Sequence, residues 1–216
     1  MIAGVRLLAF DMDGVLADTS MCHAAAFEDL WDRLGIDGPP YEKIAGRTTR
    51  DVVTEQTARL RPSAARITEW VSLKQELARR RLATDAVLFV DTIPCLEALA
   101  EHGYQIALAT SGSRAAADIV LLSSAAAACF SSVATGDDVQ RGKPAPDVYT
   151  LTMERTGHVG DETLVVEDSV PGVAAGIAAG AWVASVRSGV GIDHPRFLGR
   201  YPDLVHLSST LGVEVR

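Results

Sequence analysis

The chain has 216 residues, and its formal net charge of −8 weighs against nucleic acid or an anionic membrane as a partner. Its hydrophobic share of 48% is ordinary for a globular protein, with no apolar run of the roughly 18 residues that a membrane span needs. The N-terminus lacks signal-peptide features, and the cysteines lack metal-ligand spacing. We therefore expect a cytoplasmic, monomeric protein that binds neither nucleic acid nor membrane.

Short apolar runs alternate with segments of helical periodicity along most of the chain. The runs predict strands at residues 5–10, 105–109, 130–134, 163–166 and 182–186. The intervening segments predict helices at 94–101, 114–124, 148–156 and 172–180. This alternation is typical of a parallel sheet with crossover helices, and near-continuous apolar strands fit a sheet buried on both faces. We predict an α/β fold.

Residues 18–86 interrupt this alternation, because they contain no strand signal. Helices are predicted there at 22–34, 51–60 and 64–82, and Gly38-Pro39-Pro40 marks a turn. A connection of about 70 residues is too long for an ordinary crossover. We predict a helical cap domain at 18–87, inserted into an α/β core domain formed by 1–17 and 88–216. The alternative is one long helical crossover within a single domain.

Polar groups follow the predicted strands at their carboxyl ends. The groups are Asp11, Asp13 and Gly14 after the first strand, Thr110, Ser111 and Gly112 after the second, Lys143 beyond the third, and Glu167, Asp168 and Ser169 after the fourth. Ligands of parallel α/β sheets bind outside these strand ends. If the strands are adjacent, all four groups converge on one crevice.

Four clustered carboxylates cannot all ionise without a positive partner. Oxygen ligands suit Mg²⁺, which commonly shares its site with a phosphate, and Lys143 and Thr110 could then hold that anion. Each group also has an ordinary explanation when taken singly. Asp168 and Ser169 could cap a helix, Thr110 could form a turn, and Lys143 could be a surface lysine. Their occurrence at successive strand ends favours a common site.

The segments DMDGVLADT, ALATSGSR, GKPAPDVY and VVEDSVPG resemble, in this order, the four motifs of the haloacid dehalogenase superfamily. More narrowly they resemble its subfamily I phosphatases and phosphomutases, such as phosphoglycolate phosphatases and β-phosphoglucomutases. The resemblance extends from residue 11 to about residue 189. It implies a Rossmann-like core with an inserted helical cap and a Mg²⁺ cofactor.

The resemblance also implies roles for the residues after the strands. Asp11 would be the nucleophile that forms an aspartyl-phosphate, and Asp13 the general acid and base. Thr110 would hydrogen-bond the phosphoryl group, and Lys143 would neutralise its charge.

The same resemblance implies a set of metal ligands. The Asp11 carboxylate, the Asp13 backbone carbonyl, Glu167 and Asp168 would hold Mg²⁺. The alternative for Glu167 is a supporting position behind Asp168.

Substrate contacts are expected from the core and the cap. Ser111 and Gly112 would face the substrate from the core, and in the phosphomutase branch a histidine matching His23 works with the general acid. The segment AGRTTRD at 45–51 resembles the specificity loop of the family, which implies contacts from Gly46, Arg47 and Arg50. A lone helical histidine and a helix start have ordinary explanations as well. Lys74 could be a further contact from the cap, but a solvated helix face is the expectation for it.

These observations predict a Mg²⁺-dependent phosphatase that hydrolyses a small phosphorylated metabolite, either a sugar phosphate or a phosphoglycolate-like compound. A phosphomutase of the β-phosphoglucomutase type is the alternative within the enzymes, since it needs only that a sugar hydroxyl replaces water. The alternative outside the enzymes is a catalytically silent regulatory protein that binds a phosphorylated metabolite.

Overall fold

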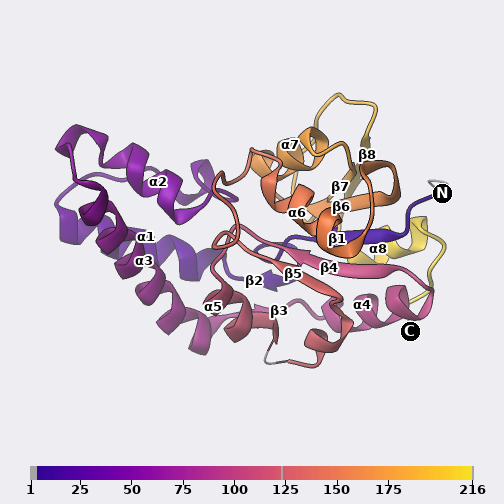
Figure 1. Cartoon of the computed structure of the whole chain (residues 1–216). Helices are drawn as coiled ribbons and strands as arrows, with labels where there is room; N and C mark the ends of the chain where they lie inside the picture. The colour runs from indigo at the N-terminus through magenta and orange to yellow at the C-terminus, as the bar shows by residue number, and fades with distance from the viewer. Residues whose placement is uncertain (1–3, 123, 216) are drawn as a thin grey trace.

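A computed structural model describes residues 4–122 and 124–215 of the chain. Within these ranges one sheet contains six parallel strands in the order β5-β4-β1-β6-β7-β8 (Figure 1). The strands are β1 (Leu7–Phe10), β4 (Gln105–Ala109), β5 (Ser132–Ala134), β6 (Thr163–Glu167), β7 (Trp182–Val186) and β8 (Phe197–Tyr201). The predicted α/β class with a parallel sheet is confirmed.

Strand β1 lies in the middle of this sheet and is buried on both faces. Its residue Phe10 is in register with Leu108 of β4 and with Val166 of β6. Successive side chains of a strand point to opposite faces. Leu8 and Phe10 accordingly join one hydrophobic cluster, whereas Ala9 joins the cluster on the other face. The three central strands therefore end at the same level, and the residues that follow them share one edge.

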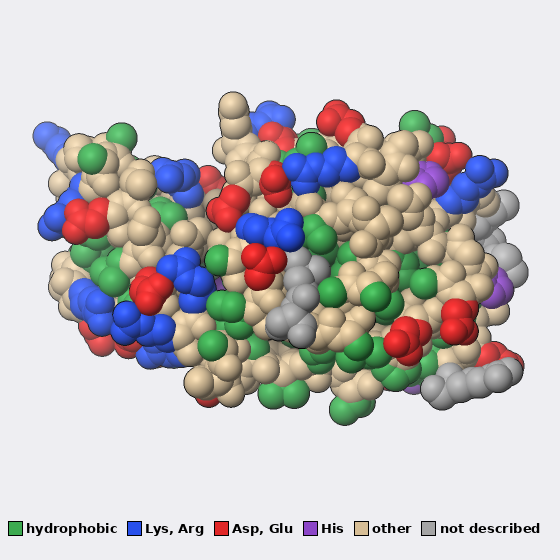
Figure 2. Space-filling view, turned by 60° about the horizontal axis from the view of Figure 1, so that its bottom comes forward, with side chains coloured by type: hydrophobic (Ala, Val, Ile, Leu, Met, Phe, Trp, Pro, Cys, Tyr) green, Lys and Arg blue, Asp and Glu red, His purple; other side chains and the backbone are tan. Residues whose placement is uncertain are grey.

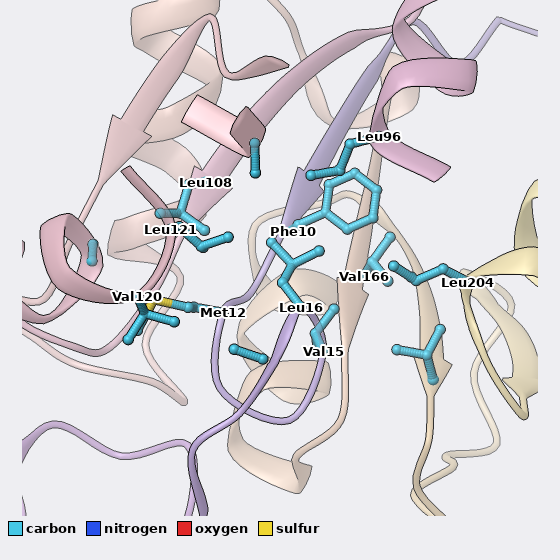
Figure 3. Close-up of a cluster of buried hydrophobic side chains, with 14 of the residues drawn as sticks. Phe10, Met12, Val15, Leu16, Leu96, Leu108, Val120, Leu121, Val166 and Leu204 are labelled. Carbon is cyan, nitrogen blue, oxygen red and sulfur yellow. The ribbon is translucent and has the colours of Figure 1, made fainter. Parts of the chain in front are cut away.

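Helices cover the two faces of the sheet. The face of Phe10 carries α4 (Thr92–Glu101), α5 (Arg114–Ala117) and α8 (Leu204–Thr210). Figure 3 shows Phe10 packed among Leu96 of α4, Leu108 and Val166. The opposite face carries α6 (Asp147–Thr156) and α7 (Val170–Ala178), seen above the sheet in Figure 1.

The core differs from the sequence-based expectation at elements that include α5, β8 and α8. The helix expected at 114–124 is α-helical only in α5 and continues as a π-helical segment at Asp118–Leu122. Strand β8 and helix α8 were not predicted. The strand contains Gly199 and Arg200 and lies half-exposed at the sheet edge, so it lacks the apolar run that marks the inner strands.

The segment between β1 and α4 is mainly helical, as expected. It contains α1 (Ser20–Leu34), α2 (Thr49–Gln56) and α3 (Ala64–Asp85), with 3-10 turns at Tyr41–Lys43 and Ala58–Leu60. These helices lie at the left end of Figure 1, and they share a hydrophobic cluster around Phe27, Trp31 and Trp70. Thr48 and Ser63 cap α2 and α3 by accepting backbone N–H groups.

Two short strands join this helical segment to the sheet. Strand β2 (Ala17–Asp18) leads out and β3 (Val87–Leu88) leads back, and the two pair antiparallel. The sequence did not predict them, because two residues are too few to form an alternating pattern. They bring the outgoing and returning connections side by side.

In the described residues, no helix combines the length and apolar character that crossing a membrane requires. Charged side chains of both signs are interspersed over the face shown in Figure 2. On α3, Arg79 and Arg80 pair with Glu76, and Arg81 pairs with Asp29 of α1. These pairs, half-buried or exposed, fit the solvated side of the helical segment.

Candidate active site

Lys143 supplies the positive partner that the buried carboxylates after β1 and β6 need. Its Nζ donates to Oδ1 of Asp11 at 2.6 Å and to Oε1 of Glu167 at 2.6 Å. A third donation, at 3.1 Å, goes to the backbone carbonyl of Ala109 at the end of β4. The Lys143 side chain is only 1% exposed. One ammonium group thus links the ends of three adjacent strands.

The charge of Lys143 is secured by its surroundings. Burial by itself would lower the pKa of Lys143, but the charges of Asp11 and Glu167 raise this pKa above its ordinary value. The Tyr149 ring lies 4.9 Å from Nζ, and its hydroxyl donates to Oε1 of Glu167 at 2.7 Å. Tyr149 was missed from the sequence, since an aromatic residue on a helix face gives no signal beyond packing.

Glu167 is fully buried, and both its carboxylate oxygens already accept hydrogen bonds. Oε1 accepts from Lys143 and Tyr149. Oε2 accepts the backbone N–H groups of Asp168 and Ser169 and the Ser169 hydroxyl, at 3.0, 3.2 and 3.0 Å. Although burial raises the pKa of Glu167, Lys143 brings it below the ordinary value. A Cβ at Gly172 would overlap this carboxylate, so α7 begins tightly against it.

Asp11, Glu167 and Asp168 each offer a carboxylate oxygen within 4.8 Å of the others. Burial, together with neighbouring carboxylates, raises the pKa of Asp168 to about 8 and also raises that of Asp11, where the charge of Lys143 acts in the opposite direction. When ionised, the three carboxyl groups therefore hold more negative charge than the single positive charge of Lys143 can balance. A Cβ at Gly14 would overlap the Asp168 carboxylate, so the glycine keeps that side open. These oxygen donors and the unmet need for positive charge fit Mg²⁺.

Asp13 faces a buried chain of polar groups from the helical segment. The Thr19 hydroxyl donates to Oδ1 of Asp13 at 2.5 Å, and Nε2 of His23 lies 3.3 Å from the same oxygen. Nζ of Lys74 lies 2.9 Å from Nδ1 of His23. If Lys74 donates to Nδ1, the imidazole carries its proton on Nε2, facing Asp13. Burial raises the pKa of Asp13, but His23 and Thr19 outweigh it and bring this pKa to about 2.

Lys74 corrects the sequence-based expectation of a solvated lysine. Its side chain comes from α3 but points inward, is 3% exposed, and places Nζ 4.2 Å from the centre of the Phe27 ring. Burial lowers the pKa of Lys74 to about 8, although Asp13 acts in the opposite direction. Helical periodicity alone could not reveal this, because a lysine on the inner side of α3 looks like a break in the pattern.

A small cavity of about 50 Å³ lies between the sheet edge and the helical segment. From the core it is lined by Asp11, Asp13, Ser111, Gly112 and Asp168. From the helical segment it is lined by residues that include His23, Tyr41, Gly46, Arg47 and Lys74. Thr110 is fully buried behind it, and its hydroxyl accepts the Gly112 N–H at 2.9 Å.

The helical segment lies directly against the core at this cavity. The Ser111 hydroxyl donates to the backbone carbonyl of Gly46 at 2.8 Å, and a Cβ at Gly46 would overlap Ser169. Arg47 lines the cavity while pairing with Glu55 at 2.6 Å. Arg50 is not among the residues that line this cavity. It lines a neighbouring one of about 280 Å³.

The strand order, the acid-rich strand ends and the helices inserted after β1 define an α/β protein with a Rossmann-like core, the architecture that the motifs led us to expect. The chain belongs to the haloacid dehalogenase-like hydrolases, whose family model matches residues 5–180. The resemblance to this superfamily is thereby confirmed, and the protein is an enzyme.

Two curated relatives and one solved structure illustrate the similarity. Protein CbbY of Rhodobacter capsulatus is 31% identical over 216 residues, covering 93% of this chain and 94% of the relative. A phosphoglycolate phosphatase of Photorhabdus laumondii is 29% identical over 184 residues, covering 83% and 79%. The crystal structure of CbbY from Rhodobacter sphaeroides with phosphate is 26% identical, with a TM-score of 0.72, covering 91% of this chain and 93% of that one.

Proposed function

We propose that the protein is a Mg²⁺-dependent phosphatase that forms an aspartyl-phosphate on Asp11. The observation that carries this proposal is the buried Lys143, which holds Asp11 at 2.6 Å beside Asp168. A carboxylate is a weak nucleophile, and it can attack phosphorus only where the charge of the phosphoryl group is neutralised. Lys143 stays charged and supplies one part of that neutralisation.

The metal would be held by the Asp11 and Asp168 carboxylates and the Asp13 backbone carbonyl. When bound, Mg²⁺ would withdraw charge from the phosphoryl oxygens. Glu167 is better suited to a supporting position, because its oxygens already hold Lys143, Tyr149 and the turn before α7. This favours the second of the two alternatives for that residue.

Asp13 is suited to move the proton in both half-reactions. Its low pKa makes it a carboxylate in the free site, but a phosphate dianion nearby would raise this pKa and let it hold a proton. Asp13 would give that proton to the leaving oxygen as the phosphorus bonds to Asp11. It would then take a proton from the water that attacks the aspartyl-phosphate.

The substrate is proposed to be a small phosphorylated metabolite, a sugar phosphate or a phosphoglycolate-like compound. The cavity of about 50 Å³ is bounded by both parts of the molecule, so residues 18–87 would act as a cap that opens to admit it. Ser111 and Gly112, which line the cavity, would contact the phosphoryl group from the core, with the Thr110 hydroxyl directly behind Gly112. Arg47 and His23 would face the substrate from the cap side. The phosphatase among the relatives supports this class of substrate.

The test is phosphate release from p-nitrophenyl phosphate and from a panel of phosphorylated metabolites, with Mg²⁺ and with a chelator. We expect turnover only with Mg²⁺. The variant Asp11→Asn should lose turnover and keep phosphate binding. The control Asp161→Asn changes an exposed carboxylate and should behave as the wild type. A near-normal rate for Asp11→Asn would contradict the assignment of the nucleophile.

A phosphomutase is the second candidate, because His23 contacts Asp13 from the cap. In a mutase a sugar hydroxyl, in place of water, takes the phosphoryl group from Asp11. Incubation with β-glucose 1-phosphate and a trace of the bisphosphate separates the two enzymes. Glucose 6-phosphate indicates a mutase and inorganic phosphate a phosphatase. A failure to turn over any ester would favour the silent binding protein.

A further inference from the structure

Arg187 contacts both connections between the sheet and the helical segment. It directly follows β7, on the far side of β6 from β1. Its Nε donates to the backbone carbonyl of Val15 at 3.2 Å, on the outgoing connection. Its guanidinium carbon lies 3.9 Å from the centre of the Phe89 ring, and Nη2 pairs with Asp91, both on the returning connection.

The backbone of Arg187 is held in an unusual conformation. Its φ of 57° lies in the left-handed region, which costs free energy for any residue with a Cβ. Its N–H donates to the carbonyl of Tyr201 at 3.0 Å, which ties this conformation to β8. The side chain is 17% exposed, and its Asp91 partner is 10% exposed. The strained backbone and the buried or half-buried partners distinguish Arg187 from the arginine of an exposed surface ion pair.

The turn that Arg187 touches also carries Asp13. The backbone N–H groups of Val15, Leu16 and Ala17 all donate to the carbonyl of Met12. Gly14 donates to the Ala17 carbonyl at 2.9 Å, so residues 12–17 form one compact unit. A displacement of Val15 would therefore be transmitted to Asp13, because only Gly14 separates them within this hydrogen-bonded turn.

The returning connection is bonded to the same turn. The Leu16 carbonyl accepts the Phe89 N–H at 3.1 Å and the Thr92 hydroxyl at 2.7 Å. Asp91 also accepts the Leu204 N–H at 3.0 Å, which fixes it to α8. Arg187 and Asp91 thus connect the end of β7 with both chain segments that flank the β2–β3 pair.

We propose that Arg187 is a positioning residue that holds the Met12–Ala17 turn, and with it Asp13, in register with Asp11 while the cap moves about the β2–β3 connections. This inference rests on the proposed phosphatase function. Arg187 does not line the cavity and has no contact with Asp11 or Asp168 among its described interactions. Its influence would reach the reaction only through the geometry of Asp13.

The test compares two substrates whose leaving groups differ in whether they must be protonated by a general acid. The p-nitrophenolate ion leaves without a proton, whereas an alkoxide needs the proton of Asp13. The ratio kcat/KM reports the steps up to the first irreversible one, which includes transfer to Asp11. We expect Arg187→Ala to lower kcat/KM for an alkyl phosphate about tenfold more than for p-nitrophenyl phosphate, since small misplacements of a catalytic group cost rate steeply.

Three further variants separate positioning from stability and backbone strain. Arg187→Gly removes the side chain but accepts the positive φ, so it should repeat the effect of Arg187→Ala. Arg187→Lys keeps the charge but cannot reach Val15 and Asp91 together, and should recover only part of the activity. The control Arg196→Ala removes an arginine that stacks on Trp182 and pairs with Asp161, and should not alter the ratio of the two substrates.

Equal losses on both substrates, or the same ratio change in Arg196→Ala, would overturn the proposal. Hydrogen exchange of the intact protein provides a readout without turnover. Residues 13–17 and 87–91 should exchange faster in Arg187→Ala than in the wild type. If the alanine variant does not fold, the same comparison is made with Arg187→Lys. Unchanged exchange there would also reject the proposal. If the wild type turns over no ester, the proposed function fails, and exchange alone decides the role of Arg187.

Discussion

Nζ of Lys143 lies 2.6 Å from Oδ1 of Asp11, although 132 residues separate them in the sequence. Their side chains are 1% and 6% exposed, so water screens neither charge. The contact arises because the parallel strands end together and the loop before α6 returns over that edge. An ion pair this deeply buried makes both partners sensitive to the loss of either one.

The first prediction concerns Lys143→Met. It leaves Asp11 and Glu167 without their shared cation, and breaking a buried pair in this way costs about 3–5 kcal/mol. We expect a loss of unfolding free energy of that order in urea at neutral pH, together with loss of turnover. The control Lys43→Met removes an exposed lysine and should change stability little. Equal stability of the two variants would show that the pair contributes nothing.

The second prediction concerns Gly14→Ala, compared with Gly157→Ala. The two glycines have φ values of +77° and +74°, so alanine costs about 1–2 kcal/mol of backbone strain at either position. A Cβ at Gly157 meets open space, whereas one at Gly14 overlaps the Asp168 carboxylate. We therefore expect Mg²⁺ affinity, measured by calorimetry, to fall only in Gly14→Ala, by roughly tenfold or more. Equal affinities would place the metal elsewhere.

The third prediction is that Mg²⁺ binds more tightly as the pH rises toward 8. In the metal-free protein, burial and neighbouring carboxylates raise the pKa of Asp168 to about 8, whereas Lys143 favours the ionised form of Asp11. Below that pH Asp168 holds a proton, which Mg²⁺ must displace, so affinity should increase up to about tenfold per pH unit for each proton released. Calorimetry at about pH 6 and about pH 8, in buffers of different ionisation enthalpy, measures the Mg²⁺ affinity and the number of protons released on binding. A pH-independent affinity without proton release would contradict this.

Much of this arrangement could be predicted from the sequence. The runs that became β1, β4 and β6 are continuous and apolar, so their type was clear, and parallel pairing brings the residues after them to one edge. The structure does bring Asp11, Lys143 and Asp168 together there, although their catalytic roles stay predictions.

The remaining features depend on tertiary packing, which a linear pattern does not record. Lys74 and Tyr149 lie on helices whose periodicity marks the inner face but gives no partners for a polar atom. Arg187 gave no signal either, because its partners Val15 and Asp91 are distant in the chain. The boundaries of the cap at 18–87 also stay a prediction.

The last prediction concerns Lys74 and alkaline pH. Burial lowers the pKa of Lys74 to about 8 in the folded protein, against an ordinary value of 10.5. Between these two values the unfolded chain holds the proton and the folded protein has released it. The free energy of unfolding should therefore rise with pH in this window, by at most about 1.4 kcal/mol per pH unit. Below pH 8 Lys74 is charged in both the folded and the unfolded state, so its contribution is constant.

The measurement is urea unfolding of the wild type and Lys74→Met from about pH 7 to about pH 10. The wild type should gain on the variant above pH 8, while the exposed control Lys43→Met should show no such trend against the wild type. A constant difference between the wild type and Lys74→Met would mean that Lys74 keeps its proton, and that burial does not bring its pKa near neutrality.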